Sequence, residues 1–120
     1  MPDIFNMSAT EYSNRASGRA KAGDDHGAIE DYSKAIELAP YNFYDLNYRG
    51  NSKYNLKDYK GAIEDYSKAL ELDPDYASAY NNRGNSKRSL GDLNGACADW
   101  RKAASLGHSN SAEWVRDLCN

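Results

Sequence analysis

The stretch Gly61 to Pro74, GAIEDYSKALELDP, decides the fold of this chain because it occurs more than once. A near copy, GAIEDYSKAIELAP, stands thirty-four residues earlier at Gly27 to Pro40, and only two of its fourteen positions differ. A weaker third copy, Gly95 to His108, reads GACADWRKAASLGH. A fixed period of this length is the signature of a repeat array, in which each unit packs mainly on its neighbours. Fold and function are therefore to be interpreted one repeat at a time.

Length and charge exclude several classes of function. The chain has 120 residues, which three units of thirty-four and a short tail nearly fill, so no room is left for a separate catalytic domain. The net charge is -3 with acids and bases interleaved, so there is no basic field of the kind that binds nucleic acid. The N-terminus MPDIFNMSATE has neither the basic cluster nor the apolar core of a secretion signal, and no apolar run could span a bilayer. We expect no nucleic-acid partner and no membrane partner.

The two cysteines, Cys97 and Cys119, are too few and too far apart in sequence for a zinc site. Such sparse usage suits a reducing compartment, so we expect two reduced thiols and a cytoplasmic protein. Cys97 replaces the isoleucine found at Ile29 and Ile63, which indicates a small buried hydrophobic residue. A hairpin turning near Gly107 would nevertheless bring Cys97 level with Cys119, and a disulfide that locks the C-terminal helix is the alternative.

Apolar residues at helical spacing predict two helices in each unit and one helix after the last unit. Ser8 or Thr10, followed by Glu11, offers the start of the first helix, and Asn110, with Glu113 three residues on, offers the start of the last. We expect the last helix to turn Ala112, Trp114, Val115, Leu118 and Cys119 toward the stack. The expected helices span residues 8–22, 25–38, 42–56, 59–72, 76–90 and 93–106, with the last beginning at 110.

These residues resemble the tetratricopeptide repeat over about Ala9 to Asn110. The family's glycine for close helix approach falls on Ala16, Gly50 and Gly84, its small residue on Ala28, Ala62 and Ala96, and its aromatic partner on Tyr32, Tyr66 and Trp100. The resemblance implies one all-α domain, a right-handed α-solenoid of three helix-turn-helix units with a seventh, capping helix. The expected units are an N-terminal tail at 1–8, repeats at 9–42, 43–76 and 77–110, and the capping helix at 111–120.

One departure from the family pattern recurs in all three units. Arginine stands where the family usually has leucine, and an aspartate follows sixteen residues later each time. The constant spacing predicts an ion pair between the two helices of a unit, or between the aspartate of one unit and the arginine eighteen residues on. We interpret these residues as structural ion pairs rather than a ligand-binding ladder: Arg15 with Asp31, Arg49 with Asp65 and Arg83 with Asp99.

In this family the first helix of each pair lines the concave face, so the resemblance implies a peptide-binding groove there. Amides on one helix face can donate to and accept from the backbone of an extended peptide. The alternative is that these amides are merely solvated. The candidate residues are Ser13, Ser17, Lys21, Tyr44, Asn47, Asn51, Tyr54, Asn55, Ser78, Asn81, Asn85 and Arg88, with Thr10, Asn14, Asn82 and Ser89 beside them.

Some members of the family grip a chaperone's C-terminal carboxylate with a clamp of lysine, asparagine and arginine. In register, those places hold Ser13, Ser17, Tyr48, Ser78 and Asn82. Every residue of that clamp is absent, so we do not expect this chain to bind chaperones by that mechanism.

The sequence therefore predicts a non-catalytic protein-interaction scaffold that binds an extended peptide or a partner helix. No catalytic set, cofactor or metal is expected, because His26 stands without further ligands in reach and no phosphate-binding loop is present. The alternative is a self-assembling structural unit, since two nearly identical repeats could stack end to end or exchange between copies as a homo-oligomer.

Overall fold

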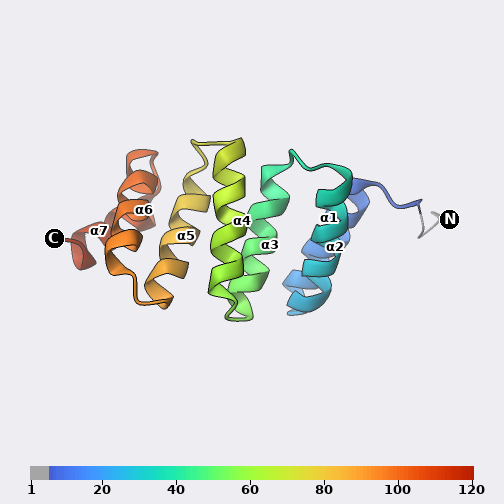
Figure 1. Cartoon of the computed structure of the whole chain (residues 1–120), viewed down its shortest axis with the longest axis horizontal. Coiled ribbons are helices and arrows are strands. Elements are labelled where there is room, and N and C mark those ends of the chain that lie inside the picture. Colours follow the sequence, from blue (N-terminus) through green and yellow to red (C-terminus); the bar gives the residue numbers. More distant parts are fainter. Residues whose placement is uncertain (1–5) are drawn as a thin grey trace.

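The fold is an all-α solenoid, in which consecutive helices stand side by side (Figure 1). The computed structural model describes residues 6–120, so residues 1–5 of the expected N-terminal tail lie outside the described residues. Within that span all regular structure is helical, which confirms the expected fold class. The helices are α1 Ala9–Lys21, α2 Asp25–Leu38, α3 Phe43–Asn55, α4 Tyr59–Leu72, α5 Ala77–Ser89, α6 Leu93–Ser105 and α7 Ser109–Leu118.

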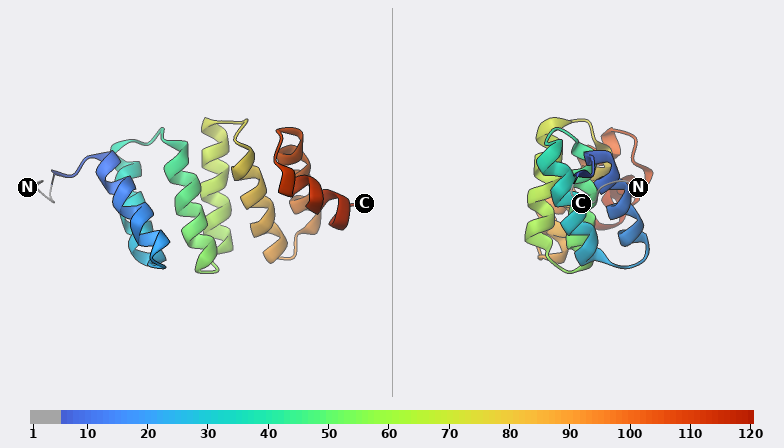
Figure 2. Two further views of the ribbon diagram at one scale, coloured as in Figure 1. Left: turned by 180° about the vertical axis from the view of Figure 1, so that it is seen from behind. Right: turned by 90° about the vertical axis from the view of Figure 1, so that its right-hand side faces the viewer.

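The stack is elongated, with extents of 56 × 25 × 20 Å. Helices α1 and α2, α3 and α4, and α5 and α6 pack as pairs, and α2 and α4 each join their pair to the next. The first helices of the pairs also contact one another in order, α1 with α3 and α3 with α5. Figure 2 shows the same row from behind and from one end. The three first helices thus form one continuous surface.

An aspartate caps the second helix of each pair. Asp24, Asp58 and Asp92 accept a hydrogen bond from the backbone N–H three residues later, at 2.9, 3.0 and 2.9 Å. The donor is a glycine each time, and a Cβ at Gly61 would collide with the carboxylate of Asp58. The repeated stretch therefore begins with glycine because the cap occupies the space of a side chain.

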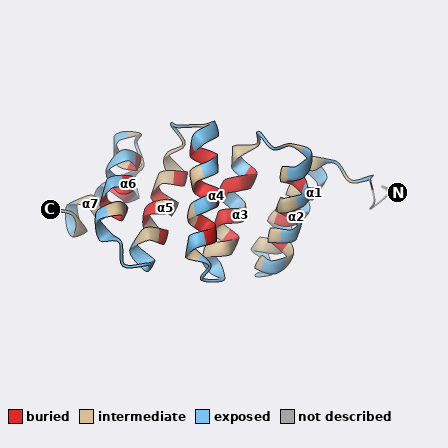
Figure 3. Cartoon of the chain, in the orientation of Figure 1, coloured by how far each residue is buried: buried red, intermediate tan, exposed pale blue. Residues whose placement is uncertain are grey.

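Close approach of the paired helices decides the core. A Cβ at Gly50 would lie 2.7 Å from the ring of Tyr66, and one at Gly84 would lie 2.7 Å from the ring of Trp100. Small residues let the two helix axes come close, and the aromatic ring fills the space beside them. Figure 3 shows the buried residues along the helix faces that meet inside the stack, and Trp100 is fully buried.

The expected ion pairs form within each unit. Arg49 donates from Nε and Nη2 to the two carboxylate oxygens of Asp65 at 2.8 and 2.7 Å, and Arg15–Asp31 and Arg83–Asp99 repeat this geometry. Among residues 6–120, no ion pair joins an aspartate to the arginine eighteen residues on. A second cation one turn later also faces each aspartate, which the arginine–aspartate spacing did not predict: Arg19, Lys53 and Lys87, each 3.1 Å away.

Helix α7 differs from expectation at its start and on its inner face. It is capped by His108, whose Nδ1 accepts from the backbone N–H of Ser111 at 3.2 Å, rather than by Asn110. Ser111 is its one fully buried residue, and Ala112 is exposed, contrary to the expectation. Trp114 remains 37% exposed while its ring lies 6.1 Å from that of Trp100. Trp114 thus lies against the stack, as expected, while part of its ring is exposed.

Cys97 and Cys119 form a disulfide across 22 residues, so the expectation of two reduced thiols is wrong. Cys97 is buried on α6 as predicted and packs with Val115 and Leu118 of α7. The disulfide was the alternative expectation. Two antiparallel helices bring residues equally distant from the turn side by side, and Cys97 and Cys119 lie at such positions. The disulfide also removes the basis for inferring a reducing compartment from unpaired cysteines.

The ion pair of the second unit should show a measurable coupling energy. We expect a double-mutant cycle on Arg49 and Asp65, measured by urea unfolding of Arg49→Met, Asp65→Asn and the double variant, to give about 0.5–3 kcal/mol. The matched control is the exposed pair Lys34 and Glu37, 3.9 Å apart, for which we expect coupling close to zero. Equal coupling for the two pairs would contradict a structural role for Asp65.

Removing the disulfide should loosen the C-terminal end. We expect Cys119→Ser to lower the free energy of unfolding by about 3 kcal/mol, because a closed loop of this length restricts the unfolded chain. Thermal unfolding of the wild type with and without a reductant measures this, with Cys119→Ser as the control that the reductant should not affect. A wild-type midpoint insensitive to the reductant would refute the bridge.

Candidate functional site

The exposed surface of the first helices carries a regular stripe of residues. Positions i, i+4, i+7 and i+11 of a helix share one face. On α3 these are Tyr44, Tyr48, Asn51 and Asn55, and the matching positions of the neighbouring helices are thirty-four residues away. The stripe comprises Thr10, Asn14, Ser17 and Lys21 on α1 and Ser78, Asn82, Asn85 and Ser89 on α5. We call this surface the groove.

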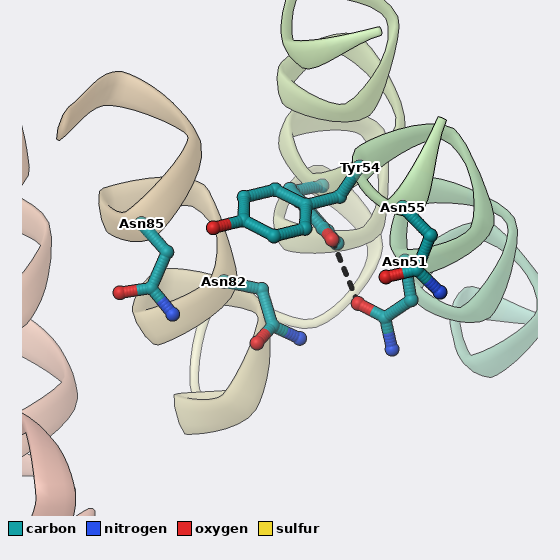
Figure 4. A pocket seen from close by; sticks show the side chains of 6 residues that line it. Asn51, Tyr54, Asn55, Asn82 and Asn85 are labelled. Atoms are coloured by element: carbon teal, nitrogen blue, oxygen red, sulfur yellow. Dashed lines mark hydrogen bonds between the residues drawn. The ribbon is translucent and has the colours of Figure 1, made fainter. Parts of the chain in front are cut away.

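A polar pocket opens in the groove between α3 and α5. It is lined by side chains of both helices and, at its floor, by the Tyr66 ring of α4: Asn51, Tyr54, Asn55, Tyr66, Asn82 and Asn85. Figure 4 shows Asn82 and Asn85 facing Asn51, Tyr54 and Asn55 across the pocket. The lining therefore consists of four amides and two phenol rings, and none of these groups is charged at neutral pH.

Two of these amides are held in a fixed orientation by buried aromatic donors. The Tyr66 hydroxyl donates to Asn51 Oδ1 at 2.7 Å, and Trp100 Nε1 donates to Asn85 Oδ1 at 3.1 Å. Burial raises the pKa of the Tyr66 hydroxyl well above its ordinary value, so it keeps its proton and remains a donor. Because each amide oxygen is engaged from below, each Nδ2 is left to donate into the groove.

Three of the predicted groove residues serve instead as ties between neighbouring repeats. Asn47 is buried, donates to the Tyr76 hydroxyl at 3.1 Å and accepts from Asn82 Nδ2 at 3.2 Å. Asn81 is also buried and accepts from Ser111 Oγ at 2.8 Å, while Ser13 Oγ donates to Asp45 at 2.7 Å. A ligand on the surface does not reach the two buried asparagines. Asparagine therefore recurs at these two positions because it packs between neighbouring helices, and not because it binds a ligand.

The remaining predicted residues lie on or beside the groove. Ser17 and Ser78 are half-buried, and Lys21 and Tyr44 are exposed. Arg88 extends over the ring of Trp114, 6.0 Å from its centroid, and the two line a second pocket with Tyr54, Asn85 and Ser89. Tyr48 also lies on the groove stripe. It was named only as a position of the carboxylate clamp and not among the candidate peptide-binding residues, although its four-residue distance from Tyr44 places both on one helix face.

Asp45 is the one buried carboxylate of the described chain that lacks a cation. It is 3% exposed, its Oδ1 accepts from Ser13, and its Oδ2 has no hydrogen-bond partner among residues 6–120. Burial raises the pKa of Asp45 above 3.8, and the Ser13 hydrogen bond offsets this in part. Asp45 in turn contributes to the raised pKa of Tyr32, about 12, for which burial is the main cause.

The described residues offer little for other kinds of chemistry. Residues 6–120 contain no group of three or more histidine, cysteine, aspartate or glutamate side chains that could hold a metal ion. Within the same span, no helix is long and apolar enough to cross a membrane. The acidic side chains Asp31, Asp65 and Asp99 are engaged by arginine and a second cation in the stack.

Two family models match the central and C-terminal repeats. Residues 50–87 match the model described as a TPR repeat, and residues 77–106 match the model described as a tetratricopeptide repeat. A search of curated protein sequences gave no match.

Several solved structures share the fold over nearly their whole length. The first TPR of Spaghetti (RPAP3), bound to the HSP90 peptide SRMEEVD, has a TM-score of 0.86 at 25% identity, covering 91% of this chain and 90% of that chain. The second TPR of the same protein, with the same peptide, has a TM-score of 0.81 at 29% identity, covering 83% and 93%. The Arabidopsis OM64 TPR domain has a TM-score of 0.85 at 24% identity, covering 91% and 94%, which shows the fold alone.

The buried Asp45 should make stability depend on pH. Its raised pKa means that the folded state holds the proton to a higher pH than the unfolded chain does. The protonated Asp45 side chain therefore makes its full contribution to the free energy of unfolding below about pH 3.8. This contribution is lost as the pH rises through the raised pKa and the buried carboxyl group becomes charged. We expect urea unfolding of Asp45→Asn and wild type to show the variant gaining relative stability as the pH rises. A difference that does not change with pH would contradict this.

Proposed function

For this tetratricopeptide-repeat protein, we propose a non-catalytic scaffold function, in which the groove of α1, α3 and α5 binds an extended peptide segment of a partner protein. The observation that carries this proposal is the pair of oriented amides, Asn51 and Asn85, on opposite walls of one open pocket. Their Nδ2 groups can donate to backbone carbonyls of a chain that lies between α3 and α5. The pocket also offers the amide oxygens of Asn55 and Asn82, which can accept from backbone N–H groups.

The similar domains support peptide binding as a use of this fold. Two of them are solved with the HSP90 peptide SRMEEVD. For this chain the neutral lining of the pocket favours recognition of backbone and shape over recognition of charge. A protein-interaction role therefore agrees with both the family and the groove.

We propose that the partner is not a chaperone tail bound through its terminal carboxylate. The five positions of the carboxylate clamp hold no cation in this chain: Ser13, Ser17, Tyr48, Ser78 and Asn82. Near the first of them lies the buried carboxylate of Asp45, which accepts from Ser13 and would repel an anion. A peptide such as SRMEEVD would thus meet neutral or negative groups where the clamp needs positive ones.

The groove is tested by selecting peptides from a displayed random library on the wild-type protein. We expect the selected peptides to lose about tenfold in affinity for Asn85→Asp, measured by fluorescence anisotropy. This change keeps the oxygen that accepts from Trp100 but replaces the groove-facing donor by a second oxygen. Asn51→Asp makes the same change opposite Tyr66 and should act in the same direction.

Asn94→Asp is the matched control, because it adds the same charge at an exposed position of α6, outside the groove. Peptides that bind Asn85→Asp, Asn51→Asp and Asn94→Asp equally well would refute the groove. Light scattering on the same samples addresses the alternative function, since a mass that rises with protein concentration would favour self-assembly instead.

A further inference from the structure

The groove carries exposed aromatic rings that are held rigidly from behind. Tyr48 is 45% exposed and stacks on Tyr32 with ring centroids 6.2 Å apart. Tyr44 is 52% exposed and packs edge-on against Tyr76 at 5.5 Å. Each ring is supported by a second ring, so it presents a flat apolar surface with little freedom left to lose on binding.

These rings continue the surface that contains the pocket. Tyr44, Tyr48, Asn51 and Asn55 share one face of α3, and the last two line the pocket. Tyr54 extends the aromatic surface toward α5, where its hydroxyl group points toward Asn85 (Figure 4). The central groove is thus a run of flat rings followed by amide donors.

This combination selects for one backbone conformation. A polyproline II segment makes no internal hydrogen bonds, so all its carbonyl groups remain free to accept. The oriented Nδ2 groups of Asn51 and Asn85 supply donors for such carbonyls. Pyrrolidine rings are compact and apolar, and aromatic-lined grooves bind proline-rich segments without the ordering cost of a flexible peptide.

The charge of the groove agrees with this kind of ligand. The six residues that line the pocket are neutral, and Tyr44 and Tyr48 beside them are neutral as well. The nearest cation in the second pocket is Arg88, which lies over the Trp114 ring. A charged peptide would find no opposite charge in the central groove and would lose part of the hydration of its charged groups. An uncharged peptide does not pay this desolvation cost.

From these observations we infer that the segment bound in the groove is uncharged and proline-rich, in the polyproline II conformation. Proline rings lie on Tyr44 and Tyr48, and the carbonyl groups that follow accept from Asn51 and Asn85. The inference rests on the proposed peptide groove and names the class of peptide that it takes.

The test is direct binding of a fluorescein-labelled dodecapeptide of Pro-Pro-Ala repeats, followed by anisotropy. Two further labelled probes are a Gly-Ser peptide of equal length and SRMEEVD, the peptide bound by the similar domains. We expect the proline-rich probe to bind at least about tenfold more tightly than either. Binding equal to that of the Gly-Ser peptide would overturn the inference.

Variants separate the role of the rings from general stability. We expect Tyr48→Ala to weaken the proline-rich probe by about tenfold and Tyr48→Phe, which keeps the ring, to bind like wild type. Tyr41→Ala is the matched control, because Tyr41 is 81% exposed in the turn between α2 and α3 and lies off the groove stripe. Equal binding by Tyr48→Ala and Tyr41→Ala, with unchanged thermal unfolding, would also overturn it.

Failure of this inference can be told from failure of the groove itself. If library peptides without proline depend on Asn85 while the Pro-Pro-Ala probe does not bind, the groove stands and the proline preference is wrong. If no peptide depends on Asn51 or Asn85, both proposals are wrong.

Discussion

The structure depends on a buried carboxylate in the second helix of each repeat. Asp65 is almost fully buried and is held by Arg49 and Lys53, which stand one turn apart on α3. Breaking a buried pair leaves an uncompensated charge, so only one rotation of α3 against α4 is tolerated. Arg49 also donates to Ser33 of the previous repeat, and Arg83 donates to Ser67 in the same way. Apolar packing supplies most of the stability, while these ion pairs fix the register.

Fixing that register decides which residues face the groove. With α3 held by Arg49, its opposite face carries Tyr48 and Asn51 outward, and Asn47 turns toward the next repeat. The first helices are then joined directly by polar contacts, from Ser13 to Asp45 and from Asn82 to Asn47, and α5 is joined to α7 from Asn81 to Ser111. Two sets of hydrogen bonds therefore fix the shape of the groove. One set joins neighbouring helices, and the other runs from Tyr66 and Trp100 to the amides of Asn51 and Asn85.

Most of the fold could be predicted from the sequence, because a residue that recurs at the same place in every unit makes the same packing contact in each. The recurrence of arginine and aspartate sixteen apart required a common contact, and that contact exists in all three units. Burial of Asn47 and Asn81 could not be predicted in this way, since asparagine recurs thirty-four residues apart both at these buried positions and at Asn51 and Asn85 in the groove. The His108 cap and the disulfide likewise belong to the last unit alone, where no second copy shows the pattern.

Repetition and variation in this chain have different physical causes. The positions that hold helix to helix must be alike in every unit, because each unit makes the same contacts with its neighbours. The groove positions differ from unit to unit, and only some of them contact a neighbouring unit, as Asn82 does through Asn47. Asn14, Tyr48 and Asn82 occupy one position, and Lys21, Asn55 and Ser89 another. Under the proposed function, a peptide that spans the groove meets a polar α1, an aromatic α3 and an amide-rich α5. Under that function, this difference between the helices would favour one direction of the bound chain.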